Sequence, residues 1–240
     1  YAQLGGGSPL VPLTRKQAAA LEARLKHDGT DARVFVAMRY WHPLSDETAR
    51  EVAAFAPDRI VLLPLYPQFS TTTTESSLKD WMRAARAAGL EAPTHAVCCY
   101  PDEDGFIAAQ VELTAAALVA ASRAGSPRVL FSAHGLPKKT IAKGDPYQRQ
   151  VETTAAAIAR KMGLGAADWV VCYQSRVGPL EWIGPSTLGE IERAGRDRVP
   201  VVVVPIAFVS EHSETLVELD IEYRHLAETA GVPRYVRAPA

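Results

Sequence analysis

The amino-acid sequence predicts an α/β fold built on parallel β-sheets. Short apolar runs alternate with helical stretches along the whole chain, which is the pattern of parallel strands joined by helices. Several of these runs are apolar at consecutive positions, as expected for strands that helices cover on both faces. With 240 residues, 48% hydrophobic and 22% charged, the chain suits one large or two small globular domains.

The expected elements follow from these patterns in chain order. Runs rich in β-branched and apolar residues predict strands at 34–38, 60–65, 94–99, 128–132, 169–173 and 199–205. Helical stretches are predicted at 14–26, 45–56, 77–88, 105–122, 146–162, 185–194 and 213–228. Helix-end signals agree with these limits, because Ser45 precedes an acidic first turn and Gly89 and Gly163 each follow the end of a helical stretch.

A polar, turn-rich segment at 100–105 separates two halves with a similar rhythm of strands and helices. We therefore predict an N-terminal domain at 1–100 and a C-terminal domain at 101–240. Two related doubly wound domains would explain the shared rhythm.

Charge and cysteine usage exclude several classes of protein. The 26 Lys and Arg balance 27 Asp and Glu, so no basic field attracts a nucleic acid. No apolar run approaches the ~20 residues of a membrane helix, and we expect no transmembrane segment. The adjacent Cys98 and Cys99, with Cys172, form neither a disulfide framework nor a CxxC metal module, which indicates a cytoplasmic protein. The chain begins at Tyr1 without a Met or a signal-peptide pattern, and we expect its natural start to lie earlier.

Functional side chains are expected where strands end, because ligands of open parallel sheets bind beyond the carboxyl ends of the strands. One such end carries His134 in the run FSAHGLP. A histidine here can simply bond the backbone and cap a turn, but imidazole is also a common metal ligand and base. Gly135 and Pro137 would hold it in a tight, rigid turn.

An acidic row follows the last predicted strand. Glu214, Glu218 and Glu222 recur at i, i+4 and i+8, which places three carboxylates on one helix face with no basic residue before Arg224. Like charges at this spacing cost about 0.2–0.5 kcal/mol per pair. The row is either a solvated face or a path for a cation. Glu214 lies close to the strand end, and carboxylate oxygens with an imidazole nitrogen suit a divalent transition metal.

The remaining candidates are aromatic or basic. Tyr66, Trp182 and Phe208 either belong to the core or line a flat apolar slot. Arg39 could bind a carboxylate through its guanidinium fork or pair with an internal acid. The glycine-rich run LGGGSPL lacks the spacing of nucleotide-binding loops.

The motifs LGGGSPL, MRYWHP, LPLYPQFSTTTT, FSAHGLP, GDPY, YQSRVGP and PIAFVSEHSETLVELDIEY occur in this order along nearly the whole chain. Together they resemble the ferrochelatase family. The resemblance implies two similar Rossmann-like domains with a porphyrin cleft between them, and insertion of Fe²⁺ into protoporphyrin IX or coproporphyrin III to form haem with release of two protons. It also implies that His134 and Glu214 are the catalytic and metal-binding residues, on opposite sides of the porphyrin.

By the same resemblance, Glu218 and Glu222 match an acidic metal path that leads away from the site, and Ser8 could reach a porphyrin propionate. The porphyrin-binding positions would be Tyr1, Ser8, Arg39, Tyr66, Trp182 and Phe208.

The chain departs from the family pattern at some points. Glu75 stands where the family usually has Gly, which leaves the loop after Thr74 open, and the family's first strand and C-terminal helix would lie before Tyr1 and after Ala240. Some members carry an iron-sulfur cluster with one ligand in the YPQ loop. Thr71 occupies that loop here, so no cluster is assigned, no cofactor is expected, and Fe²⁺ is a substrate.

Two rival functions stay open, a cobalt or nickel chelatase for another tetrapyrrole and a non-catalytic porphyrin or haem carrier. Peripheral membrane contact is allowed, and the sequence does not choose between a monomer and a homodimer.

Overall fold

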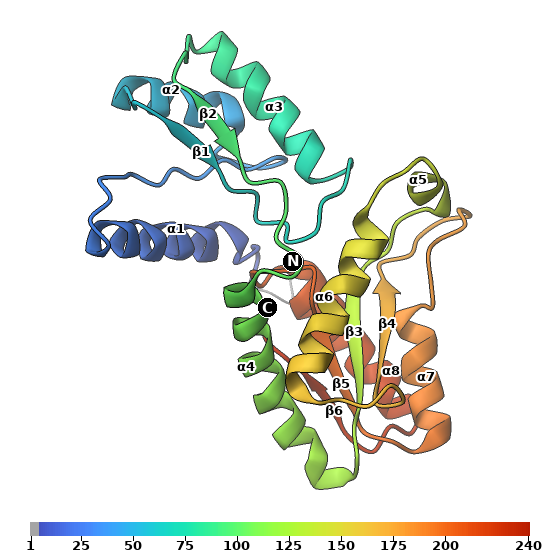
Figure 1. Ribbon diagram of the computed structural model, residues 1–240. Coiled ribbons are helices and arrows are strands. Elements are labelled where there is room, and N and C mark those ends of the chain that lie inside the picture. Colours follow the sequence, from blue (N-terminus) through green and yellow to red (C-terminus); the bar gives the residue numbers. More distant parts are fainter. Residues whose placement is uncertain (1–4) are drawn as a thin grey trace. The chain divides into compact units, whose positions relative to one another are not determined.

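The structure is a computed structural model that describes residues 5–240, and the chain divides into two compact units (Figure 1). The larger unit contains Tyr66–Phe69 and Tyr100–Ala240 together with the residues up to Ser8, and the smaller contains Pro9–Leu65 and Ser70–Cys99. Both units pair their strands in parallel, which confirms the predicted α/β class. The domain ranges 1–100 and 101–240 stay a prediction.

The larger unit is built on a four-stranded parallel sheet with the order β4-β3-β5-β6. Its strands are β3 (Arg128–His134), β4 (Trp169–Gln174), β5 (Val201–Pro205) and β6 (Tyr235–Arg237). Phe131 of β3 lies opposite Val171 of β4 and Val204 of β5, so the central strand is paired along both edges. Its five inner residues are buried, as the apolar run predicts.

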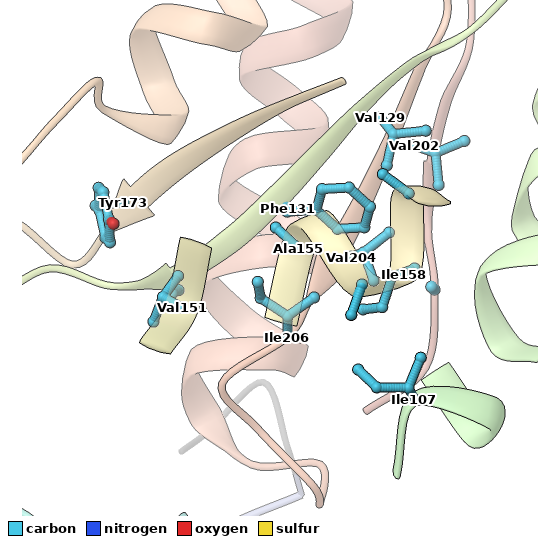
Figure 2. Packing of buried hydrophobic residues seen from close by; sticks show 14 of the residues in the cluster. Ile107, Val129, Phe131, Val151, Ala155, Ile158, Tyr173, Val202, Val204 and Ile206 are labelled. Carbon is cyan, nitrogen blue, oxygen red and sulfur yellow. The ribbon is translucent and has the colours of Figure 1, made fainter. Parts of the chain in front are cut away.

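Helices cover both faces of this sheet. Alternate residues of β3 and β5 pack against α4 (Asp104–Ala121) and α6 (Tyr147–Met162), and Figure 2 shows Phe131 and Val204 beside Ala155 and Ile158 of α6. The intervening residues pack against α7 (Thr187–Asp197), the π-helix η3 (Glu214–Glu222) and α8 (Tyr223–Thr229). Because successive side chains of a strand point to opposite faces of the sheet, the larger unit has two separate hydrophobic cores, one on each face.

The direction in which strands are added to the sheet reverses at β3. The chain passes from β3 to β4 on one side and then returns to place β5 on the other side of β3. Ligands of open α/β sheets bind at such a reversal of strand order, because the two connections leave in opposite directions. His134 ends β3, and the segment that carries Glu214 follows β5.

One helical stretch, Asp104–Ala124, is long and apolar enough to cross a membrane by length and composition. It joins α4 to the short helix η2 (Ser122–Ala124). The expectation that no stretch approaches this length was therefore wrong, because alanines fill α4 between its few polar residues. Ile107, Thr114 and Ala121 of α4 are buried and lie about two helical turns apart, which is typical of a helix with one face in the core.

The smaller unit contains α1 (Leu10–His27), α2 (Ser45–Phe55), β1 (Ile60–Leu62), α3 (Thr74–Ala87) and β2 (Thr94–Ala96). Strands β1 and β2 pair in parallel, and Ala49 and Val52 of α2 pack with Trp81 of α3 in its core. Glu75, at the predicted departure, lies in the first turn of α3 and pairs with Lys79 at 2.7 Å.

The predicted strand at 34–38 is wrong. Two of its backbone groups bond side chains: the amide of Val34 donates to Glu22 Oε2 at 2.7 Å, and the carbonyl of Val36 accepts from Thr48 Oγ1 at 2.8 Å. Within this described segment, only Met38 forms a bridge, with Leu44. The short strand β6 and the helix α5 (Lys138–Ala142) were not predicted.

Gly195 of α7 shows how closely the helices of the larger unit approach each other. A methyl group at this position would overlap the backbone carbonyl of Ala230, which follows α8. Alanine normally stabilises a helix relative to glycine by about 1 kcal/mol, but here we expect Gly195→Ala to destabilise the fold by about 1–3 kcal/mol through overpacking. Thermal unfolding followed by circular dichroism measures this. Gly7→Ala is the control, because no atom lies within 4 Å of the added methyl. An equal or higher unfolding midpoint for Gly195→Ala would contradict the packing described.

Candidate functional site

His134 ends β3 with one ring nitrogen fixed and the other free to react. Its Nδ1 lies 2.7 Å from the carbonyl oxygen of Gly135. A carbonyl can only accept a hydrogen bond, so Nδ1 carries the proton and Nε2 of the neutral ring keeps its lone pair. This is the tautomer that a metal ligand or a general base requires.

The turn after His134 is held by the strand end and by a second segment. Gly135 donates its amide to the carbonyl of Gln174 at 2.8 Å, and a Cβ at Gly135 would lie 3.0 Å from that oxygen and 3.2 Å from Trp182 Cε3. Pro137 forms an antiparallel bridge with Trp182. Only glycine fits this approach without movement, and the predicted rigid turn after His134 is thus present with Trp182 against it.

Glu214 opens η3 and presents its carboxylate to His134. Its Oε2 lies 3.9 Å from Nε2 of His134 and 3.9 Å from Nε2 of His212. This oxygen is buried and has no hydrogen-bond partner among residues 5–240. Buried polar atoms are nearly always satisfied, so the unpartnered oxygen indicates a place for a proton or a cation.

The spacing of these atoms suits a metal ion. A first-row ion such as Zn²⁺ binds imidazole nitrogen and carboxylate oxygen at about 2.0–2.2 Å. The 3.9 Å between His134 Nε2 and Glu214 Oε2 is close to twice that distance. One ion could therefore bridge the two atoms with little movement of either residue.

The charge state of Glu214 follows from its neighbours. Burial raises the pKa of Glu214, but the adjacent imidazoles of His212 and His134 lower it by more, so its pKa lies below that of an ordinary glutamate. Glu214 is therefore ionised at neutral pH and offers a negative charge to a cation.

His212 belongs to this cluster, although the sequence analysis gave it no role. Its ring packs on Phe208 with 4.7 Å between centroids, and its Nδ1 lies 3.2 Å from the carbonyl oxygen of Ser210. As in His134, the carbonyl fixes the proton on Nδ1 and leaves Nε2 to face Glu214. Nε2 of each histidine and Oε2 of Glu214 thus face one another, and the imidazoles lower the pKa of Glu214 only while Nε2 also carries a proton. The signal in the sequence was its place two residues before Glu214, in the same loop. Across residues 5–240, no group of three or more His, Cys, Asp or Glu is already arranged to hold a metal.

The predicted acidic row lies on a π-helix, and its members have different surroundings. Glu218 accepts four hydrogen bonds: from Gln174 Nε2 at 3.1 Å, from the amide and hydroxyl of Ser175 at 2.9 and 2.5 Å, and from the Tyr223 hydroxyl at 2.8 Å. Ser175 has a left-handed φ of 58°. Glu222 is exposed. Glu218 therefore ties the π-helix to the end of β4.

The other predicted porphyrin residues lie in both units. Tyr66, Trp182 and Phe208 are half-buried in the larger unit, as is Ser8. Trp182 donates its Nε1 proton to the carbonyl of Val177 at 3.2 Å. The structure brings Trp182 to the turn after His134 and Phe208 to His212.

Two predicted positions are not among the described residues of the larger unit. Arg39 belongs to the smaller unit, where its Nε donates to Ser76 Oγ at 3.0 Å and its guanidinium lies over the Tyr40 ring. Tyr1 lies outside the described residues.

Comparison with known proteins identifies the family. The family model described as Ferrochelatase matches residues 1–240. Ferrochelatase of Caulobacter vibrioides is 59% identical over 245 residues, which cover 100% of this chain and 69% of that protein. The chain belongs to the ferrochelatase family. The ferrochelatase of Phenylobacterium zucineum is 56% identical over 242 residues, with 100% of this chain and 69% of that protein covered.

A solved structure of SirB from Bacillus subtilis with Fe³⁺ shares the fold of this ferrochelatase-family chain. The TM-score is 0.64 at 13% sequence identity, and the likeness covers 94% of this chain and 82% of SirB. The family model and the ferrochelatase relatives confirm the resemblance carried by the sequence motifs, and the likeness to SirB confirms the α/β fold. The predicted porphyrin cleft between two domains stays a prediction.

Proposed function

We propose that this ferrochelatase-family enzyme inserts Fe²⁺ into a porphyrin at the cluster formed by His134, His212 and Glu214. The reaction forms haem and releases two protons. The observation that supports this site is the buried Oε2 of Glu214, which lies 3.9 Å from two imidazole nitrogens and has no partner within the described chain. An incoming cation or a pyrrole proton would satisfy it.

The roles of the two predicted catalytic residues follow from their charge and tautomer. His134 accepts a pyrrole proton at Nε2 while the Gly135 carbonyl holds its ring in place. General-base help of this kind contributes about 10²- to 10⁴-fold. Glu214, ionised because its pKa is lowered, holds the metal or accepts the second proton. Trp182 contacts the turn after His134, and Phe208 packs on the imidazole of His212. Both supply aromatic surface for the macrocycle, and Tyr66 is a further candidate.

The proposal treats Fe²⁺ as a substrate and requires no cofactor. A cytoplasmic location is supported by three cysteines that form no disulfide among residues 5–240. We interpret α4 as a core helix and not as a membrane span, because one of its faces packs on the sheet. Peripheral membrane contact and the choice between monomer and homodimer do not affect the proposed chemistry.

Anaerobic mixing of the protein with porphyrin and a metal, followed at the Soret band, separates this function from its rivals. We expect many haem molecules per protein molecule with Fe²⁺. A carrier would give only a stoichiometric spectral shift, and a cobalt or nickel chelatase would favour Co²⁺ or Ni²⁺. The ratio of kcat/KM for protoporphyrin IX and coproporphyrin III identifies the preferred ring.

The acidic row makes a separate prediction. If Glu222 helps to deliver the cation from solvent, Glu222→Gln should raise the KM for Fe²⁺ by a few-fold and leave the porphyrin KM unchanged, because it removes uniform binding of one substrate. Glu228→Gln is the matched control, an exposed glutamate on the adjoining helix α8. Steady-state kinetics with Fe²⁺ varied at saturating porphyrin decides the matter. If the KM for Fe²⁺ is unchanged in both Glu222→Gln and Glu218→Gln, neither residue helps to deliver iron. Glu222 is then an ordinary surface charge and Glu218 a structural hydrogen-bond acceptor.

A further inference from the structure

Arg237 lies in β6, outside every motif that suggested a site, yet it contacts both ends of the segment that carries Glu214. Its side chain is 8% exposed. Nε and Nη2 donate to the two carboxylate oxygens of Asp220 at 2.8 and 2.6 Å, and Nη1 donates to Glu211 Oε1 at 2.9 Å. Glu211 comes three residues before Glu214 and Asp220 comes six after it.

The sheet fixes the position of this guanidinium. Arg237 pairs with Val203 of the buried strand β5, and its Nη1 also donates to the carbonyl of Ala238 at 3.0 Å. A planar fork that binds a carboxylate through two parallel bonds defines direction as well as distance. Because Arg237 is held in the sheet, its hydrogen bonds fix the positions of the Glu211 and Asp220 carboxylates relative to β5 and β6.

The segment between these two acids needs such support. A π-helix is rare and occurs mostly as a short local feature, so η3 depends on contacts outside itself. Tyr235, also of β6, donates its hydroxyl to the carbonyl of Leu219 at 2.7 Å. A buried arginine paired with two partly buried carboxylates adds little net stability, because desolvation offsets the attraction. A role in fixing position is the better-supported reason to keep such a group.

We propose that Arg237 is a positioning residue for Glu214: its guanidinium holds Glu211 and Asp220 and so places the Glu214 carboxylate beside Nε2 of His134. This inference rests on the proposed function of the His134–Glu214 pair. Arg237 itself contacts neither residue in any described interaction. Both carboxylates raise the pKa of Arg237 by more than burial lowers it, so its charge is permanent.

Two variants test the role of the fork. Arg237→Lys keeps the charge but cannot reproduce the bidentate geometry. The triple variant Arg237→Met, Glu211→Gln, Asp220→Asn removes the whole group and leaves no buried unpaired charge, so it keeps the fold testable. For both we expect kcat for Fe²⁺ insertion to fall about tenfold or more, because small misplacements at a reacting centre have effects of this size. The porphyrin KM should stay within about twofold of the wild-type value.

Arg224→Lys is the matched control. Arg224 also faces Asp220, with 3.6 Å between Nη2 and Oδ1, but its side chain is 44% exposed and it makes no described contact with Glu211. We expect its kcat to stay within about twofold of wild type, as for an exposed ion pair.

All proteins are assayed well below their own unfolding midpoints, measured in parallel. If Arg237→Lys and the triple variant both unfold at lower temperatures but keep the wild-type kcat, the positioning role is overturned. Arg237 is then a structural residue. Wild-type kcat in Arg237→Lys alone would overturn the requirement for the fork. Absence of turnover in the wild-type protein would instead contradict the proposed function, so the two failures are distinguishable.

Discussion

Replacement of His134 by Ala should abolish metal insertion while porphyrin still binds. The change removes the only imidazole at the end of β3, with its Nε2 lone pair 3.9 Å from Glu214 Oε2. We expect kcat to fall by about 10²- to 10⁴-fold, the usual contribution of a general base. The porphyrin dissociation constant, measured by fluorescence quenching, should change little because aromatic and apolar surface supplies most of the binding.

His225→Ala is the matched control for this variant. His225 is an exposed histidine of α8 in the same unit, and its imidazole takes part in none of the side-chain interactions of the described residues, while its carbonyl accepts from Thr229 Oγ1 at 2.8 Å. Its turnover should equal that of the wild type. Normal turnover by His134→Ala would contradict the mechanism outright.

Replacement of Glu214 by Gln should depress kcat by about 10²-fold or more, because it removes the charge that stabilises the metal or the transferred proton and keeps the shape of the side chain. The porphyrin KM should be nearly unchanged. Because the pKa of Glu214 lies below the ordinary value, the wild-type carboxylate stays ionised between pH 5 and 8, so protonation of Glu214 should not limit activity in that range. Anaerobic initial rates across this range measure both effects. A Glu214→Gln variant with wild-type kcat would remove Glu214 from the reaction.

The sequence was sufficient to predict three of the four strands of the larger sheet and to place His134 and Glu214 after two of them. Strands β3, β4 and β5 are runs of apolar residues long enough to indicate burial on both faces, and parallel strands bring their carboxyl ends to one edge. The strand ends therefore indicated the same edge of the sheet for both residues, and the resemblance to the ferrochelatase family supplied their pairing.

The features that the sequence could not predict depend on contacts between distant residues. The segment at 34–38 has a strand-like composition, but side chains from two helices occupy its backbone groups. Strand β6 has three residues, too few for a periodic signal. No local pattern distinguishes a π-helix from an α-helix at 214–222, since the π-helical form rests on its tertiary anchors.

The same limit applies to single residues of the site. Glu218 was grouped with Glu214 and Glu222 by spacing, but Ser175 and Tyr223 engage it in hydrogen bonds that only the folded chain reveals. His212 had only its place two residues before Glu214 as a signal, and Arg237 had none, because its contacts with Glu211 and Asp220 exist only in the folded chain.

In the proposed mechanism the Fe²⁺ substrate binds between His134 and Glu214 before it enters the ring, and Nε2 of His134 is then free to accept a pyrrole proton. Crystals of the protein soaked anaerobically with Fe²⁺, and measured at wavelengths on both sides of the iron absorption edge, test this most directly. We expect an anomalous peak between His134 Nε2 and Glu214 Oε2, about 2 Å from each atom. Iron bound only elsewhere, with no peak between these two atoms, would contradict it.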